Sequence, residues 1–229
     1  MLKLNAGSSA IMFKVTDAAG NDSALSFQNY TLDTTAPTTS VATATFSNDS
    51  GTSSTDFVTN TASQTLSGTL SANLAAGERV YVSLDNGSIW TLATATVGAN
   101  TWSLGGRTLT ASSTLKVRVS DTAGNDGAVR SQAYVYDTSA PTITFGSLSL
   151  SADTGASGTD FITKVASQTI TATLSAAPAA GDIVYGSLDN GTTWTDVTNK
   201  VSGTTLSWSG ITLTGSSTLK LKVTDAAGN

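Results

Sequence analysis

Asp137-Thr-Ser-Ala-Pro141 decides how this chain is organised, because a near-copy, Asp33-Thr-Thr-Ala-Pro37, lies 104 residues earlier. Each pentapeptide stands between two runs in which apolar and polar residues alternate. Proline fixes its own φ and drives the preceding residue toward extended geometry, so each pentapeptide predicts a short, stiff linker. A linker repeated at a fixed spacing indicates a tandem array of domains. The aspartate at its start then needs an explanation.

The repeat divides the 229 residues into three parts. We expect residues 1–32 to be the C-terminal fragment of one repeat and residues 33–136 to be a complete repeat. We expect residues 137–229 to be a further repeat that lacks its last strand. Because the final residues 222–229 are identical to residues 14–21, we predict an unpaired sheet edge where that strand would lie.

Short alternating runs and tight turns predict an all-β fold. Leu115, Val117 and Val119 alternate with polar residues, which is the period-two pattern of a half-buried strand. Asp121-Thr-Ala-Gly-Asn125 and Asp85-Asn-Gly87 are hairpin turns, because Gly and Asn tolerate left-handed backbone geometry. About seven such strands in each repeat, without helical periodicity, predict tandem immunoglobulin-like antiparallel β-sandwiches. Short linkers would join these sandwiches into an extended rod.

Composition argues against several classes of function. The chain has no cysteine and no histidine, so thiolate metal sites and a Ser-His-Asp triad are absent. The net charge of −5 disfavours nucleic acid, and no apolar run is long enough to insert into a membrane. We therefore expect a protein that is not an enzyme. A glycosidase that uses two aspartates is the least favoured alternative, because the acids recur identically in each repeat.

The acidic residues follow the repeat closely. All of the sixteen except Glu78 are aspartate, and most recur at the 104-residue step, whereas most basic residues do not. Aspartate is favoured where a short carboxylate folds back on the backbone or chelates a cation. The strand order of an immunoglobulin-type sandwich brings several of these carboxylates to one boundary, where they would repel one another. Ca²⁺, which takes six to eight oxygen ligands, would relieve that repulsion.

We predict two kinds of calcium site. The first is at the joints, where each linker aspartate meets the Asp and Asn of a hairpin turn. These joint residues are Asp17, Asn21, Asp33, Asp121, Asn125, Asp137, Asp225 and Asn229. Asp33 would be grouped with Asp121 and Asn125, and Asp137 with Asp225 and Asn229.

The second kind of calcium site uses acids of a polar loop, Asp49 with Asp56 and Asp153 with Asp160. We call these four residues the loop aspartates. The alternative for both kinds of site is that the aspartates only cap their own turns.

Four motifs together resemble a known family. They are Asp33–Pro37, the Ser-Asn-Asp-Ser-Gly loop of residues 47–59, Leu84-Asp-Asn-Gly with Trp90, and Asp121-Thr-Ala-Gly-Asn125. The chain resembles the bacterial Ig-like repeats of giant surface adhesins, the Bap-like and related proteins that Gram-negative bacteria export by type I secretion. The resemblance covers almost the whole chain. It departs from that family in the missing last strand and in the absence of a terminal adhesive or secretion module.

This resemblance implies an extracellular stalk at the bacterial cell surface that supports cell adhesion or biofilm formation. It also implies that calcium stiffens the joints and that the partners are neighbouring Ig-like repeats of the same chain.

The tryptophans suggest a different function. Trp90 and Trp194 directly follow the Asp-Asn-Gly turns, and Trp102 and Trp208 fall in a later strand. An exposed Trp90 or Trp194 could stack on a sugar ring, which would make the chain a module that binds host or matrix glycans or a receptor. The alternative is that these large aromatic side chains fill the core of the sandwich.

Overall fold

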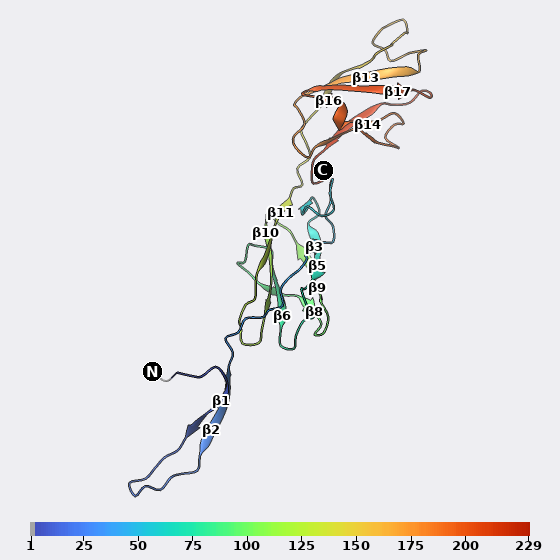
Figure 1. The fold of residues 1–229 in the computed structure, drawn as a ribbon. Helices are drawn as coiled ribbons and strands as arrows, with labels where there is room; N and C mark the ends of the chain where they lie inside the picture. The colour runs from blue at the N-terminus through green and yellow to red at the C-terminus, as the bar shows by residue number, and fades with distance from the viewer. Residues whose placement is uncertain (1–2) are drawn as a thin grey trace. The chain divides into compact units, whose positions relative to one another are not determined.

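The structure is a computed structural model, and it describes residues 3–229. These residues form β-strands and a single short 3-10 helix, Thr198–Lys200, which confirms the predicted all-β class (Figure 1). The chain divides into two compact units. The first comprises Met1–Thr45, Thr65–Gly106 and Ser113–Ala133, and the second comprises Phe46–Gln64, Arg107–Ser112 and Tyr134–Asn229. This division passes through the strands of the second repeat rather than along the repeat boundaries.

The first repeat is represented by one hairpin. Strands β1 (Gly7–Phe13) and β2 (Ser26–Leu32) pair antiparallel, with Gly7 opposite Leu32 and Phe13 opposite Ser26. They form a two-stranded sheet. Phe13 is 63% exposed, although Val117, at the same position of the second repeat, is fully buried. The hairpin therefore leaves side chains exposed that a complete sandwich covers.

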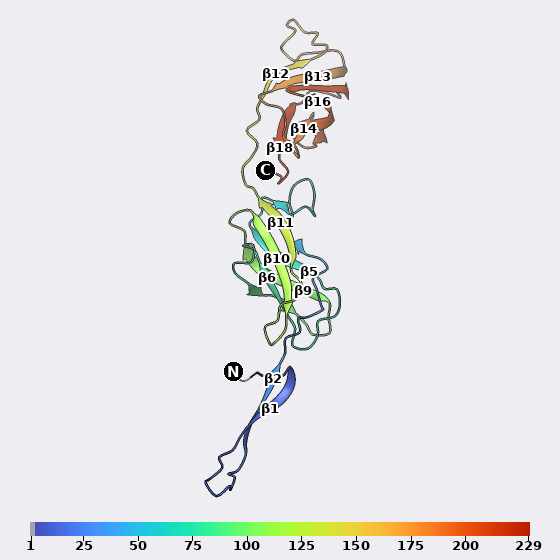
Figure 2. The ribbon, with the colours of Figure 1, turned by 60° about the vertical axis from the view of Figure 1, so that its left-hand side comes forward.

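The second repeat forms the two sheets of a β-sandwich. One sheet has the order β3-β5-β9-β8, with β3 at Thr45–Phe46, β5 at Ser63–Thr69, β9 at Thr101–Thr108 and β8 at Thr94–Ala95. The other has the order β4-β11-β10-β6-β7, with β4 at Val58–Thr59, β11 at Arg130–Tyr136, β10 at Ser113–Ser120, β6 at Arg79–Ser83 and β7 at Thr91–Leu92. Figure 2 shows β6, β10 and β11 of the second sheet. The predicted immunoglobulin-like sandwich is confirmed.

The alternating residues of the second repeat supply its core. Val117 and Val119 on β10 and Val80 on β6 have no exposed surface. In an antiparallel pair, alternate side chains point to the same face of the sheet. The register places Val119 opposite Val80. The period-two pattern of the sequence therefore becomes one continuous apolar face.

The third repeat also forms two sheets. The first has the order β12-β13-β17-β16, with β12 at Phe145–Leu150, β13 at Ser167–Leu174, β17 at Thr205–Thr212 and β16 at Val201–Ser202. The second has the order β15-β14-β18, with β15 at Thr195–Asp196, β14 at Ile183–Ser187 and β18 at Lys220–Thr224. Ile170, Val184 and Leu206 are central to its core. Among residues 3–229, β18 forms an edge of its sheet.

Each sandwich buries one tryptophan, but the two tryptophans stand at positions that do not correspond between the repeats. In the second repeat, Trp102 is 2% exposed and lies on Gly68, where a Cβ atom would come within 2.9 Å of the indole ring. In the third repeat, Trp208 is 8% exposed and lies on Gly186, where a Cβ would be 2.3 Å from the ring. Both tryptophans therefore belong to the cores. The glycine that makes room for the indole lies on the neighbouring strand β5 in the second repeat and on β14 of the other sheet in the third.

Candidate functional site

The hairpin turn Asp-x-x-Gly-Asn closes on its own aspartate. Asp121 Oδ1 accepts hydrogen bonds from the backbone N–H groups of Ala123 and Asn125, both at 2.9 Å, and its Oδ2 accepts one from Asn125 Nδ2 at 2.8 Å. Gly124 takes the left-handed conformation that the turn requires, with φ of 89°. The hydrogen bonds from Asn125 hold the pKa of Asp121 below its ordinary value. The carboxylate thus acts as the cap of the turn.

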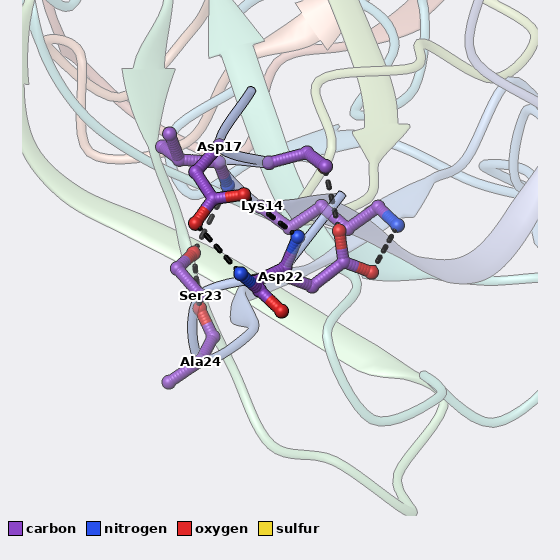
Figure 3. A network of polar contacts seen from close by, with 8 residues as sticks. Lys14, Asp17, Asp22, Ser23 and Ala24 are labelled. Carbon is purple, nitrogen blue, oxygen red and sulfur yellow. Dashed lines mark hydrogen bonds and ion pairs between the residues drawn. The ribbon is translucent and has the colours of Figure 1, made fainter. Parts of the chain in front are cut away.

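The same turn occurs in the other two repeats. In the first, Asp17 accepts hydrogen bonds from the backbone and the side chain of Asn21, which lower its pKa (Figure 3). Beside it, Lys14 forms an ion pair with Asp22 at 2.5 Å. In the third repeat, burial alone would raise the pKa of Asp225, but hydrogen bonds from Asn229 and the turn hold it below its ordinary value.

The joint residues meet through the asparagine and not through the linker carboxylate. Asn125 Nδ2 donates to the backbone oxygen of Asp33 at 3.1 Å, and Asn229 Nδ2 donates to that of Asp137 at 2.9 Å. Each contact lies within one compact unit. The Asp137 carboxylate instead accepts the backbone N–H of Ser139 at 2.9 Å. The predicted groups Asp33–Asp121–Asn125 and Asp137–Asp225–Asn229 are therefore brought together, by direct hydrogen bonds.

Within the second unit, the turn at residues 225–229 also contacts the loop of residues 47–60. Ser50 Oγ donates to the backbone oxygen of Ala227 at 2.7 Å. A Cβ atom on Gly51, whose φ is 95°, would lie 1.9 Å from the backbone oxygen of Ala226. Only glycine fits there. Sequence reasoning selected the acids of this loop and missed Ser50 and Gly51, because no local pattern marks a close approach between distant backbones.

The loop aspartates keep one oxygen without a partner. Asp49 Oδ2 accepts the backbone N–H of Phe57 at 2.9 Å, whereas its Oδ1 is buried and has no hydrogen-bond partner in the described part of the chain. Burial raises the pKa of Asp49, and the neighbouring charge of Asp56 raises it further. Phe57 has a φ of 63°, an uncommon conformation for so large a residue.

The third repeat reproduces this arrangement independently. Asp153 Oδ2 accepts the N–H of Phe161 at 2.9 Å, its Oδ1 is again buried without a partner among residues 3–229, and Phe161 has a φ of 62°. Asp160 Oδ1 accepts the N–H of Ile162 at 3.0 Å. Two copies of the loop thus hold a carboxylate oxygen away from both water and a donor.

No cluster of three or more His, Cys, Asp or Glu side chains able to hold a metal occurs within residues 3–229. A calcium ion at either kind of site would therefore have two carboxylates at most and would need carbonyl, amide, hydroxyl or water oxygens for its remaining ligands.

Cations cover the two tryptophans that follow the Asp-Asn-Gly turns. The guanidinium of Arg118 lies 4.1 Å from the centre of the Trp90 ring, and Lys222 Nζ lies 4.6 Å from that of Trp194. Both rings are partly buried. A cation above an aromatic face is attracted by the negative charge of that face. One face of each indole is thus already used for an internal contact.

The Asp-Asn-Gly turns also use their aspartate as a cap. Asp189 accepts hydrogen bonds from the hydroxyl and N–H of Thr193 and from the hydroxyl of Ser187, at 2.6 to 3.0 Å. Chiefly the Thr193 hydroxyl lowers the pKa of Asp189 from 3.8 to about 2. At this position the capping interpretation is sufficient.

Asp189→Asn is expected to reduce the stability of the third repeat near neutral pH, with a deficit that shrinks as the pH falls from 3.8 toward about 2. A depressed native pKa adds stability above the unfolded pKa, and protonation of the native state removes it. Urea unfolding of both proteins across this pH range measures the effect. A deficit that stays constant over the range would contradict this assignment.

A family model agrees with the fold of the second repeat. Residues 35–138 match the model of the family described as bacterial Ig-like domain. A crystal structure of the chicken CNTN1 FN1–FN3 domains is similar at 13% identity and a TM-score of 0.39, covering 96% of this chain and 73% of that chain. No curated protein matches the chain. The second repeat is thus similar to bacterial Ig-like domains, which are usually extracellular or surface modules and typically not enzymes.

No helix in the described residues is both long enough and apolar enough to cross a membrane. An Ig-like module of this kind fits the role of an extender in a surface protein.

Proposed function

We propose that this chain is a segment of the stalk of a bacterial cell-surface adhesin, in which it carries no active site and supports cell adhesion or biofilm formation. The family match of residues 35–138 supports the class of module. The observation that carries the proposal is the anchored linker. In both complete linkers, a hairpin asparagine binds the backbone oxygen of the first linker residue. The partners of each repeat are then its neighbours along the chain.

The anchoring has a mechanical consequence. Asn229 binds the carboxylate of Asp225 and the carbonyl oxygen of Asp137 with the same amide group. The turn and the start of the linker are thereby held together, and Pro141 restricts φ at the end of that linker. A segment restrained at both ends of its linker resists bending better than one joined by a flexible chain.

Calcium is the cofactor that we propose, and the loop aspartates fit it better than the joint residues. Asp121 and Asp225 already accept three hydrogen bonds each from their own turn. Asp49 and Asp153 each keep a buried oxygen without a partner, close in sequence to a second carboxylate. Asp49 with Asp56, and Asp153 with Asp160, would hold the ion. When bound, it would supply the positive charge that offsets their repulsion.

We expect calcium to raise the melting temperature and to narrow the range of dimensions seen by small-angle scattering, relative to chelator. Binding to the folded state alone stabilises it by about 2.7 kcal/mol when free calcium is about one hundred times the Kd. Equal melting temperatures and equal dimensions with calcium and with chelator would contradict the calcium proposal. The stalk proposal would not be contradicted by that result, because it rests on the anchored linkers.

The double variant Asp49→Asn/Asp153→Asn is expected to be at least as stable as the parent in chelator and to lose most of the response to calcium. The amide keeps an acceptor for the N–H of Phe57 or Phe161 and removes a partly buried charge. The matched variant Asp121→Asn/Asp225→Asn should lose stability in chelator and keep the response. If Asp121→Asn/Asp225→Asn loses the response to calcium and Asp49→Asn/Asp153→Asn keeps it, the joint residues and not the loop aspartates bind the ion.

Binding of host or matrix glycans through Trp90 and Trp194 is the alternative function. The cation above each ring disfavours it.

A further inference from the structure

The chain holds two Asn-Gly pairs, Asn86-Gly87 and Asn190-Gly191, and they stand at the same position of the second and third repeats. Asn86 and Asn190 have φ of 59° and 63°, and the glycines that follow them have φ of 95° and 90°. A hairpin turn with two successive residues in the left-handed region favours Asn followed by Gly. The backbone of the hairpin therefore selects the dipeptide that is most prone to deamidation.

Deamidation of an Asn-Gly pair needs only water. The backbone nitrogen of the glycine loses its proton and attacks Cγ of the asparagine, so that the new N–C bond closes a succinimide ring and the Cγ–Nδ2 bond breaks. The side-chain nitrogen takes up a proton from water and leaves as ammonia. Water then opens the ring at either carbonyl, which yields aspartate or isoaspartate. Glycine favours the reaction because it has no Cβ atom to hinder the approach of its nitrogen.

A buried serine holds the glycine nitrogen of each turn. Ser83 Oγ accepts the backbone N–H of Gly87 at 2.8 Å, and Ser187 Oγ accepts that of Gly191 at 2.8 Å. Both serines are 1% exposed. They are the last residues of β6 and β14, so the sheet fixes the position of their hydroxyl groups. The hydrogen bond stabilises the protonated nitrogen and points its N–H at the serine oxygen.

An aspartate in each turn commits the serine hydroxyl to this role. Ser83 Oγ donates its own proton to Asp85 Oδ1 at 2.6 Å, and Ser187 Oγ donates to Asp189 Oδ1 at 2.8 Å. The serine oxygen therefore presents only lone pairs to the glycine and does not donate to a deprotonated nitrogen. The neighbouring carboxylate also opposes the negative charge that proton loss would place on that nitrogen.

Burial does not protect either asparagine. Asn86 and Asn190 are exposed, so water reaches both the amide that would leave and the ring that would then be hydrolysed. Protection must therefore act on the glycine nitrogen, which is the group that each serine holds.

We propose that Asn86 and Asn190 are deamidation sites that the hydroxyl groups of Ser83 and Ser187 keep unreactive in the folded chain. Isoaspartate would insert a side-chain carbon into the backbone of the turn. Either product would also add a negative charge beside the aspartate of the same turn. Loss of the protection would therefore break the hairpin. The proposal depends neither on calcium nor on the stalk function.

The test follows deamidation of the folded chain at mildly alkaline pH by mass spectrometry of its peptides, with the chain in guanidinium chloride as the unprotected reference. In the parent, both asparagines should deamidate more slowly than in the reference. Ser187→Ala should speed deamidation at Asn190 by about two- to tenfold, the factor that corresponds to a hydrogen bond worth about 0.5–1.5 kcal/mol. Asn86 in the same molecule should keep its rate. Parent rates equal to the reference, or an unchanged rate at Asn190 in Ser187→Ala, would overturn the proposal.

The second repeat provides the reciprocal experiment. Ser83→Ala should speed deamidation at Asn86 and leave Asn190 as the control within the same molecule. A faster reaction at both asparagines in either serine variant would show that the effect is not local to the turn and would overturn the proposal.

Thr193→Val separates loss of the serine hydrogen bond from a general loosening of the turn. Thr193 Oγ1 donates to Asp189 Oδ2 at 2.6 Å, so this variant weakens the turn but keeps the bond between Ser187 and Gly191. It should deamidate at Asn190 more slowly than Ser187→Ala. Hydrogen exchange is the second measurement, because the Gly191 amide should lose protection in Ser187→Ala and keep it in Thr193→Val. Equal deamidation in the two variants, or an unchanged Gly191 amide in Ser187→Ala, would overturn the proposal.

Discussion

Trp102→Ala is expected to lower the free energy of unfolding of the second repeat by about 3–5 kcal/mol. Trp102 is 2% exposed, so its removal leaves a cavity in a close-packed core as well as losing apolar contact. Trp90→Ala should cost less, because that ring is only partly buried and its distinctive contact is the cation–π interaction with Arg118. Such an interaction is worth about 0.5–1 kcal/mol at an exposed site.

Urea unfolding followed by circular dichroism measures both changes. Trp102→Phe is the matched control, because it keeps an aromatic ring and removes an indole N–H that is buried without a partner in the described residues. It should therefore cost clearly less than Trp102→Ala. Equal losses for Trp102→Ala and Trp90→Ala would contradict the assignment of one ring to the core and the other to its surface.

The same variants test glycan binding. If Trp90→Ala and the parent give the same result on a glycan array, the binding alternative fails. If the parent binds a glycan and Trp90→Ala loses that binding while Trp102→Phe retains it, the Trp90 surface becomes a binding site and the stalk proposal needs a second function.

Gly186→Val is expected to lower the stability of the third repeat by about 1–3 kcal/mol, the usual cost of overpacking a core. The second repeat has Val82 at this position, so the substitution would be neutral if the two sandwiches had identical cores. In the third repeat, however, a Cβ at position 186 would lie 2.3 Å from the ring of Trp208. The indole and the new side chain cannot occupy the same space.

Trp208→Leu should restore part of the stability lost in Gly186→Val, because leucine is the residue that the second repeat carries at the matching position, Leu104. Thermal melting of the parent, both single variants and the double variant gives the coupling between the two sites. Gly215→Ala, with open space around the new methyl group, is the control and should change stability by less than about 0.5 kcal/mol. If the stability changes of Gly186→Val and Trp208→Leu simply add in the double variant, the two side chains do not compete for the same space in the core.

The two repeats show where reasoning from the sequence reaches its limit. The alternating run at Leu115, Val117 and Val119 predicted a strand with one buried face, and all three side chains are buried. By contrast, nothing in the sequence indicates that Trp102 fits over Gly68 while Trp208 fits over Gly186. These pairs lie on different strands, so their packing depends on register and not on local spacing.

The site shows the same division. The strand order expected of an immunoglobulin-type sandwich was sufficient to group Asp137 with Asp225 and Asn229, and the structure places Asn229 against both aspartates. It could not show that the contact to Asp137 would be made to the backbone oxygen. Nor could it show which aspartates would be satisfied by their own turns and which, such as Asp49, would keep a buried oxygen without a partner.

The sequence by itself therefore determined the strands, the turns and the linkers of this protein, because backbone conformation at these places depends on residues a few positions apart. Proline restricts φ, glycine permits left-handed geometry, and alternation sets which face is apolar. Only the tertiary structure decided which carboxylates are capped and which tryptophans are buried. Burial and hydrogen bonding there depend on segments that are far apart in the chain and that meet only when the sandwich has formed.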